Sequence, residues 1–202
     1  MNIFCIGRNY IDHAKELNNP VPTTPVVFCK PNGALLKDNK PFYYPEFSKD
    51  IHYEVEILLK IGKPGKSISE SKAADYISEI GLGIDFTARD IQENQKKKGL
   101  PWEIAKGFDH SAVIGDWIKA EEMNWDSISF RLTRNSELVQ QGNSGDMIFS
   151  FQKIIAYLSG IFKLGTGDII FTGTPAGVGT VQIGDLLEGY IGDRRMFWTE
   201  IR

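Results

Sequence analysis

The sequence predicts a strand-rich α+β fold with few helices. Two observations support this prediction: several segments alternate apolar and polar residues with a period of two, and only short stretches show the 3.6-residue period of a helix. The alternation is clearest over residues 51–61, where His52, Glu54, Glu56 and Leu58 share one face. With 202 residues, 42% of them hydrophobic, the chain can bury a sizeable core, and we expect a single domain over residues 1–202.

The segments before residue 51 predict short elements separated by loops. Apolar runs indicate strands, a helical period indicates a helix, and clusters of Pro and Asn mark loops. We expect a strand at residues 2–6, a short helix at residues 9–17, a buried strand at residues 25–30 and a loop over residues 34–49.

The middle of the chain predicts two helices around a strand. Residues 67–70 have the form of a capping box, and apolar residues then recur at helical spacing, so we expect a helix over residues 69–79 that Gly81 closes. Residues 82–88 alternate again and predict a strand, followed by a short polar helix over residues 90–98.

The last third predicts hairpins and one amphipathic helix. Turn residues between alternating segments indicate hairpins, and apolar residues at helical spacing indicate the helix. We expect a hairpin over residues 128–139 around Asn135, a helix over residues 147–158, and strands at residues 168–172, 186–191 and 195–201.

Composition excludes several classes of partner. The formal net charge of -3 argues against a protein that binds nucleic acid or anionic membranes, because both need a surplus of Lys and Arg. No stretch approaches the roughly 18 apolar residues of a membrane span, and the N-terminal residues lack the pattern of a signal peptide. Cys5 and Cys29 lie in apolar stretches, which predicts buried reduced thiols. We therefore expect a cytoplasmic protein.

Carboxylates on two predicted strands form a candidate metal site. Glu54 and Glu56 are two residues apart on a strand, so they point the same way with Cα atoms roughly 6.6 Å apart. A solvated strand face would show the same spacing, but the neighbouring residues are apolar, and the next strand carries Asp85 in an equally apolar frame. Three carboxylates without Cys or a helical His pair favour Mg²⁺, Mn²⁺ or Ca²⁺ over zinc.

Two further patterns carry chemistry. His13 and Glu16 are three residues apart in the predicted helix, so the carboxylate could orient the imidazole as a general base, although a surface His near a Glu has the same spacing. Residues 173–179 are rich in Gly, which allows backbone N–H groups to approach an anion, and a tight turn explains the pattern almost as well. Basic residues that could bind carboxylates occur in or near these motifs: Arg8, Lys30, Arg89 and Lys106.

Taken together, these segments resemble the fumarylacetoacetate hydrolase family, most closely its short acylpyruvase and oxaloacetate decarboxylase branch. The matching stretches follow the family's order over nearly the whole chain, at residues 7–13, 28–31, 52–56, 85–92, 96–102, 147–150 and 172–179. The first motif lies close to Met1, which favours the short branch. The resemblance implies a mixed β-sheet roll of the family's C-terminal domain type, and a homodimer.

The resemblance also implies roles for individual residues. Glu54, Glu56 and Asp85 would bind Mg²⁺ or Mn²⁺, with Ca²⁺ as an ion that crystals can contain. His13 with Glu16 would activate water, and Lys106 would stabilise enolate charge. The residues expected to line the substrate pocket are Arg8, Lys30, Arg89, Gln92 and Thr174. His110 stands where many relatives carry a smaller residue, so we expect it at the pocket rim.

The implied activity is cleavage of a C–C bond in a small 2-oxo acid through a metal-stabilised pyruvate enolate. Acylpyruvate hydrolysis needs a base to activate water, whereas oxaloacetate decarboxylation needs no nucleophile, so one site can perform both. Two alternatives stay open: an isomerase, tautomerase or other catabolic enzyme of 2-oxo acids on the same scaffold, and a non-catalytic metal-binding protein.

Overall fold

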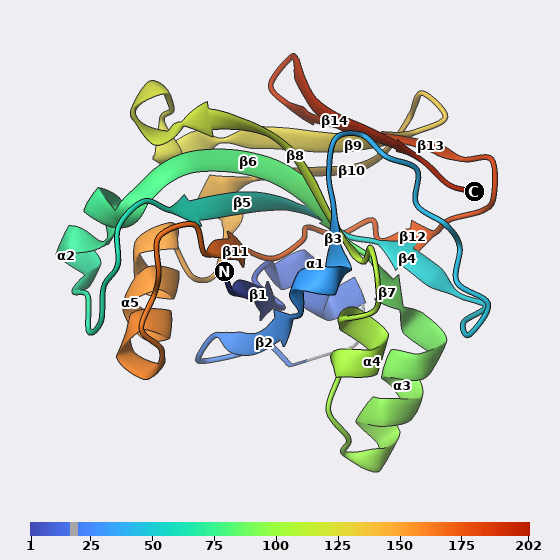
Figure 1. Cartoon of the computed structure of the whole chain (residues 1–202), viewed down its shortest axis with the longest axis horizontal. Helices are drawn as coiled ribbons and strands as arrows, with labels where there is room; N and C mark the ends of the chain where they lie inside the picture. Colours follow the sequence, from blue (N-terminus) through green and yellow to red (C-terminus); the bar gives the residue numbers. More distant parts are fainter. Residues whose placement is uncertain (17–19) are drawn as a thin grey trace.

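The computed structural model describes residues 1–16 and 20–202, and its strands form three sheets (Figure 1). The largest sheet has seven strands in the order β2-β1-β11-β5-β6-β8-β3. It is mixed, because β1 runs parallel to β11 and β3 parallel to β8 while the other neighbours are antiparallel. Its strands are β1 (Ile3–Gly7), β2 (Val26–Lys30), β3 (Leu35–Leu36), β5 (Val55–Ile61), β6 (Ile77–Asp85), β8 (Ala112–Lys119) and β11 (Ile169–Phe171).

Two smaller sheets and short helices complete the fold. The four-stranded sheet contains β10 (Glu137–Asn143), β9 (Ser129–Arg134), β13 (Leu186–Ile191) and β14 (Arg194–Glu200), and the three-stranded sheet contains β12 (Gly179–Thr180), β4 (Ile51–Tyr53) and β7 (Thr87–Ala88). The α-helices are α1 (Ile11–Glu16), α2 (Glu70–Ala73), α3 (Arg89–Lys98), α4 (Glu103–Lys106) and α5 (Phe151–Ile161). Short 3-10 turns cover Asn32–Ala34, Ala74–Tyr76, Ala120–Glu122, Trp125–Ser127 and Ser144–Asp146. This architecture confirms the predicted strand-rich α+β class.

The main core lies between the two larger sheets. Buried residues of β5, among them Val55, Ile57 and Leu59, belong to one apolar cluster with Leu132 of β9 and Phe197 of β14. In Figure 1 the strands β9, β10, β13 and β14 lie over the curved strands β5, β6 and β8, with α2 and α5 at one end and α3 and α4 at the other. This layered arrangement explains the strict period of two in β5, because one face of the strand packs against the second sheet.

Two neighbouring strands pass from the largest sheet into the three-stranded sheet at the same level. The strand expected over residues 51–61 divides at Glu54 into β4 and β5, and the strand expected over residues 82–88 ends at Asp85, with β7 beginning after Phe86. The Asp85 N–H donates to the Glu54 carbonyl at 2.9 Å, which holds the two junctions side by side. The acidic residues therefore lie where the chain leaves one sheet for another.

The prediction of a helix over residues 69–79 is wrong in length. The α-helix covers only Glu70–Ala73, and β6 begins at Ile77, where it pairs with Ile61 of β5. Gly81 lies inside β6, and a Cβ there would be 2.8 Å from the Trp117 ring. Gly81 thus marks close packing against an aromatic side chain, and the burial gained by strand pairing overrides the helical spacing.

Other expectations need smaller corrections. The strand at 25–30 is only partly buried: β2 is an edge strand, in which Lys30 is buried and Cys29 is exposed, although both cysteines are free thiols as expected. The helix expected from residue 147 begins at Phe151, since the Ser150 hydroxyl caps it by accepting from the Lys153 N–H. Strand β8 was missed because Gly115 interrupts its apolar run. The expected helix end at residue 17 lies outside the described residues.

A pair of glycine substitutions tests the packing of the largest sheet. Gly83 faces Glu56 across the β5–β6 ladder, and a Cβ there would lie 2.2 Å from the Val113 carbonyl oxygen. Gly83→Ala should therefore lower the free energy of unfolding by about 1–3 kcal/mol or more. Gly160→Ala in α5 meets no atom within 4 Å and should raise it by about 0.5–1 kcal/mol. Urea unfolding of both variants measures the difference, and equal effects would contradict the close approach at Gly83.

Candidate active site

Three buried carboxylates converge at the junction of the sheets. Glu54, Glu56 and Asp85 each offer an oxygen, and these atoms lie within 4.8 Å of one another. Glu54 and Asp85 stand at the ends of β5 and β6, while Glu56 points into the same space from within β5. All three are at most 5% exposed. An all-oxygen set of this kind fits a hard divalent cation.

Buried cations surround two of these carboxylates. Lys106 Nζ lies 2.7 Å from Glu54 Oε2 and 2.8 Å from Asp85 Oδ2, so one ammonium bridges both groups. Arg89 pairs with the other oxygen of Glu54, and Lys30 Nζ lies 2.7 Å from Asp85 Oδ1. Among residues 1–16 and 20–202, Glu56 has no cationic partner and accepts a hydrogen bond only from the Gly173 N–H, at 2.7 Å.

Because Glu54 has cationic partners and Glu56 has none within the ranges that the structure describes, the pKa values of these two carboxylates shift in opposite directions. Burial acts to raise the pKa of Glu54, but the charges of Lys106 and Arg89 outweigh it and hold that pKa below its usual range. Burial raises the pKa of Glu56, and the negative charges of Asp85 and Glu54 raise it further. Glu56 is therefore the carboxylate whose charge lacks compensation, and a divalent cation bound among the three would supply it.

Asn9 brings three distant segments to the pocket. Its amide N–H groups donate to the carbonyls of Phe149 at 3.0 Å and Thr172 at 2.8 Å, and its Oδ1 accepts from the Phe149 N–H at 2.8 Å. Gly173 has a φ of 104°, and a Cβ there would lie 2.5 Å from Asn9 Cβ, so only Gly fits. These contacts fix Arg8 on one side and Thr174 on the other, facing the carboxylates.

Helix α1 carries the candidate base. His13 is 4% exposed, and its Nδ1 lies 3.4 Å from Glu16 Oε2. Glu16 also accepts from the Gly177 N–H at 3.1 Å, which ties α1 to the Gly-rich loop. Burial lowers the pKa of His13 below its ordinary value, although Glu54 and Glu16 act in the opposite direction. A neutral imidazole at physiological pH can accept a proton.

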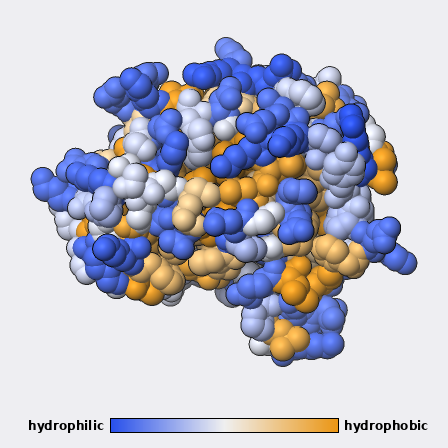
Figure 2. Space-filling view, viewed as in Figure 1, coloured by the Kyte–Doolittle hydropathy of each residue, from blue (hydrophilic) through white to orange (hydrophobic). Residues whose placement is uncertain are grey.

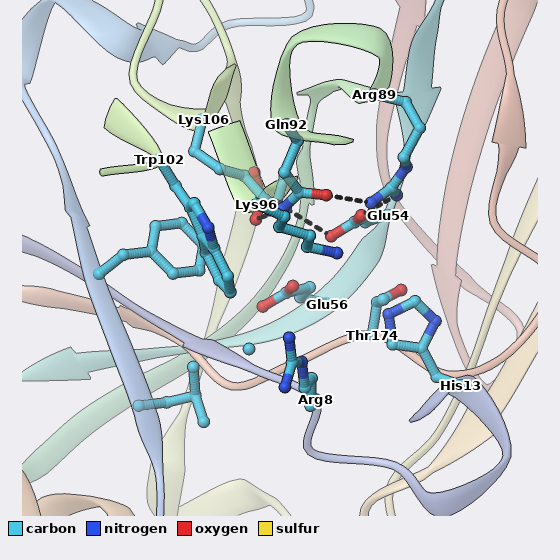
Figure 3. Close-up of a pocket in the computed structure, with 14 residues that line it drawn as sticks. Arg8, His13, Glu54, Glu56, Arg89, Gln92, Lys96, Trp102, Lys106 and Thr174 are labelled. Atoms are coloured by element: carbon cyan, nitrogen blue, oxygen red, sulfur yellow. Dashed lines mark hydrogen bonds and ion pairs between the residues drawn. The ribbon is translucent and has the colours of Figure 1, made fainter. Parts of the chain in front are cut away.

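Most of the residues expected at the site line one pocket (Figure 3). Lys30 does not line it, because the fully buried ammonium lies behind Asp85, where the Ser111 hydroxyl accepts from it at 3.0 Å. His110 is exposed and is not part of the lining. The expected residues in the lining are Arg8, His13, Glu54, Glu56, Asp85, Arg89, Gln92, Lys106 and Thr174.

The structure adds functional candidates that the sequence patterns did not single out. Lys96 of α3 and Trp102, which precedes α4, also line the pocket. Gln140 of β10 donates to the Thr174 hydroxyl at 2.9 Å and accepts from the Val55 N–H at 2.9 Å, so it orients the pocket loop relative to β5. Lys96 and Trp102 fall in a stretch that matches the family, but Gln140 carries no motif that could have identified it.

Comparison with known proteins settles the family. Residues 2–197 match the model of the C-terminal domain of fumarylacetoacetate (FAA) hydrolase. The chain belongs to the fumarylacetoacetate hydrolase family. A mouse protein named mitochondrial oxaloacetate tautomerase FAHD1 is 42% identical over 191 residues, covering 94% of this chain and 86% of the relative. A Dictyostelium discoideum protein named mitochondrial oxaloacetate decarboxylase is 40% identical over 188 residues, covering 92% and 86%.

A solved structure of the fumarylacetoacetate hydrolase family shares the fold. The fumarylpyruvate hydrolase of Pseudomonas aeruginosa, solved with Mn²⁺ and pyruvate, superposes with a TM-score of 0.94 at 34% identity, covering all of this chain and 89% of that one. None of the helices in residues 1–16 and 20–202 is both long and apolar enough to cross a membrane. The mouse and Dictyostelium relatives are named as mitochondrial proteins, so the cytoplasmic location of this chain stays a prediction.

Proposed function

We propose that this protein is a divalent-metal-dependent enzyme that cleaves a C–C bond in small 2-oxo acids, by acylpyruvate hydrolysis or oxaloacetate decarboxylation. The observation that carries the proposal is the convergence of three buried carboxylates and His13 on one pocket, with Glu16 outside the lining and paired with the His13 ring. The names of a decarboxylase relative and of a fumarylpyruvate hydrolase with the same fold support it.

The donor set fits Mg²⁺ or Mn²⁺, which Glu54, Glu56 and Asp85 would hold. When bound, the ion supplies Lewis-acid stabilisation of the enolate that forms as the C–C bond breaks. Lys106 and Arg89 are buried cations at the same place, so they would bind the oxygens of the substrate's 2-oxo acid group and add to that stabilisation. Gln92 orients the Arg89 guanidinium by accepting from it at 2.6 Å.

His13 would act as the base in hydrolysis, a step that decarboxylation does not need. In hydrolysis the imidazole takes a proton from the water that attacks the acyl carbonyl, and Glu16 holds the ring through Nδ1. Decarboxylation needs no such water.

A second candidate is tautomerisation of oxaloacetate, which the name of the mouse relative favours. In this reaction His13 would move a proton between C3 and the 2-oxo oxygen without breaking a C–C bond. Both candidates pass through an enolate of a 2-oxo acid: the enolate of pyruvate when a C–C bond is cleaved, and the enolate of intact oxaloacetate when only a proton moves.

Assays with and without metal test the proposal. The purified protein would be assayed with acetylpyruvate and oxaloacetate in the presence of Mg²⁺ or Mn²⁺, with a chelator as control. Metal-dependent production of pyruvate is the expected result. Deuterium exchange at C3 of oxaloacetate without pyruvate formation would favour the tautomerase, and no metal-dependent turnover of any kind would refute both reactions.

The pH dependence of hydrolysis reports on His13. Because burial lowers the pKa of this imidazole, the neutral base persists to a lower pH than a free histidine allows. Hydrolysis should therefore be constant through neutrality and fall only as the pH drops below about 6.5, the ordinary value of histidine. Initial rates between pH 5 and 8, with metal saturation confirmed at each pH, measure this limb. An acid limb centred above the ordinary value would contradict the proposed neutral base.

We also propose that residues 1–202 act as one catalytic domain in a cytoplasmic homodimer. Apolar side chains exposed at one end of the molecule support the dimer: Phe47 is 53% and Ile104 is 65% exposed, and both border one apolar groove. Figure 2 shows apolar colour in the region where Figure 1 places α3 and α4. Light scattering after gel filtration measures the mass, and a monomer at micromolar concentration would contradict the dimer.

A further inference from the structure

Two cations in the pocket have no carboxylate partner. Arg8 and Lys96 both line it, yet neither takes part in an ion pair among residues 1–16 and 20–202. The other pocket cations already form ion pairs, since Lys106 and Arg89 contact Glu54 and Lys106 also contacts Asp85. A divalent ion at the three carboxylates would add positive charge, so it would leave Arg8 and Lys96 still without an anion.

Both cations are held over one aromatic ring. The guanidinium carbon of Arg8 lies 5.8 Å from the centroid of the Trp102 ring, and Lys96 Nζ lies 5.7 Å from a ring centroid of the same residue. They come from separate elements, because Arg8 follows β1 and Lys96 belongs to α3. Figure 3 shows the two side chains extending into the pocket on either side of Glu56. The fold thus brings two like charges together at one wall.

Such a pair is unfavourable unless an anion joins it. Burial lowers the pKa of Lys96, and the nearby charges of Arg89 and Arg8 lower it further. Arg8 also has a φ of 61°, an uncommon backbone conformation for a residue other than Gly. Strain and repulsion at one place are typical of a site prepared for a ligand.

We propose that Arg8 and Lys96, supported by the Trp102 ring, bind the second carboxylate of a 2-oxo dicarboxylic acid. This inference rests on the proposed function, in which the 2-oxo acid group binds near Glu54 and Lys106. Two cations from different elements can clamp one distal carboxylate through charge-assisted hydrogen bonds. The pair therefore selects dicarboxylic 2-oxo acids over monocarboxylic ones.

Matched substrates measure this selectivity. The magnesium-loaded protein would hydrolyse fumarylpyruvate, which has a distal carboxylate, and acetylpyruvate, which has none. In Lys96→Met, loss of a charge-assisted hydrogen bond should raise KM for fumarylpyruvate about 10- to 100-fold and change KM for acetylpyruvate less than about 2-fold. Arg8→Gln should act in the same direction. Lys97→Met changes the exposed neighbouring lysine of α3 and should leave both substrates unaffected.

A binding experiment separates this inference from the proposed function. Calorimetry would compare 2-oxoglutarate with 2-oxopentanoate, which has the same chain length and lacks the distal carboxylate. Tighter binding of 2-oxoglutarate that Lys96→Met abolishes supports the inference even if no substrate is turned over. Equal binding of the two acids by the wild-type protein would overturn it, as would equal losses for fumarylpyruvate and acetylpyruvate in Lys96→Met.

Discussion

Glu56→Gln is expected to abolish every activity of the protein and to weaken binding of Mg²⁺ or Mn²⁺ by more than the roughly 10- to 100-fold that loss of a ligand-orienting group costs. Glu56 is the one carboxylate of the three without a cationic partner in the described part of the chain, so its charge is the one that a bound ion compensates. Glutamine keeps the shape and can still accept from the Gly173 N–H. Calorimetric titration with metal, followed by assay at saturating metal, measures both effects.

The same substitution makes a prediction about stability. A buried carboxylate without a cationic partner opposes folding, so the metal-free Glu56→Gln protein should unfold at the same temperature as the wild type or a higher one. Added metal should then raise the unfolding temperature of the wild type but not that of Glu56→Gln. Glu79→Gln is the control, because Glu79 pairs with Lys60 away from the pocket, at 2.5 Å. Wild-type metal affinity in Glu56→Gln would refute the assignment of Glu56 as a ligand.

The period of two in the sequence was sufficient to predict that the three carboxylates lie close together. It placed Glu54 and Glu56 on one face, and the neighbouring strand supplied Asp85 because the two strands pair with Glu54 beside Asp85. The sequence patterns did not reveal that both strands divide at this level, since a change of pairing partner leaves the alternation of side chains intact. Nor could spacing distinguish a cation that lines a pocket from one behind it, as Lys30 shows.

The two elements that the sequence patterns predicted wrongly or missed have a common cause. Residues 69–79 show helical spacing, but Ile77 and the residues after it gain more burial as part of β6 between β5 and β8. Strand β8 was missed because Gly115 breaks its apolar run, and this Gly is needed where β14 crosses: a Cβ there would lie 2.5 Å from the Met196 carbonyl oxygen. Local patterns omit contacts between distant segments, and such contacts decide both cases.

His13→Ala is expected to separate the candidate reactions. Removal of the base should slow acylpyruvate hydrolysis about 10²- to 10⁴-fold, because no other neutral imidazole lines the pocket in the described residues. The affinity for metal should change less than about 2-fold, since the three carboxylates remain and His13 is not one of the proposed ligands. Oxaloacetate decarboxylation should persist, because carbon dioxide leaves without attack by water. Initial rates with both substrates at saturating Mg²⁺ measure the three quantities.

The pattern of losses in His13→Ala identifies the role of the imidazole. Loss of hydrolysis with retained decarboxylation indicates that His13 activates water, whereas loss of C3 proton exchange as well indicates that it moves the substrate's own proton, as a tautomerase requires. His110→Asn is a matched control, because His110 is exposed outside the pocket and Asn tolerates its φ of 63°. Unchanged hydrolysis in His13→Ala would refute the assigned base, and a wild-type protein that bound metal but turned over nothing would favour a non-catalytic member of the family.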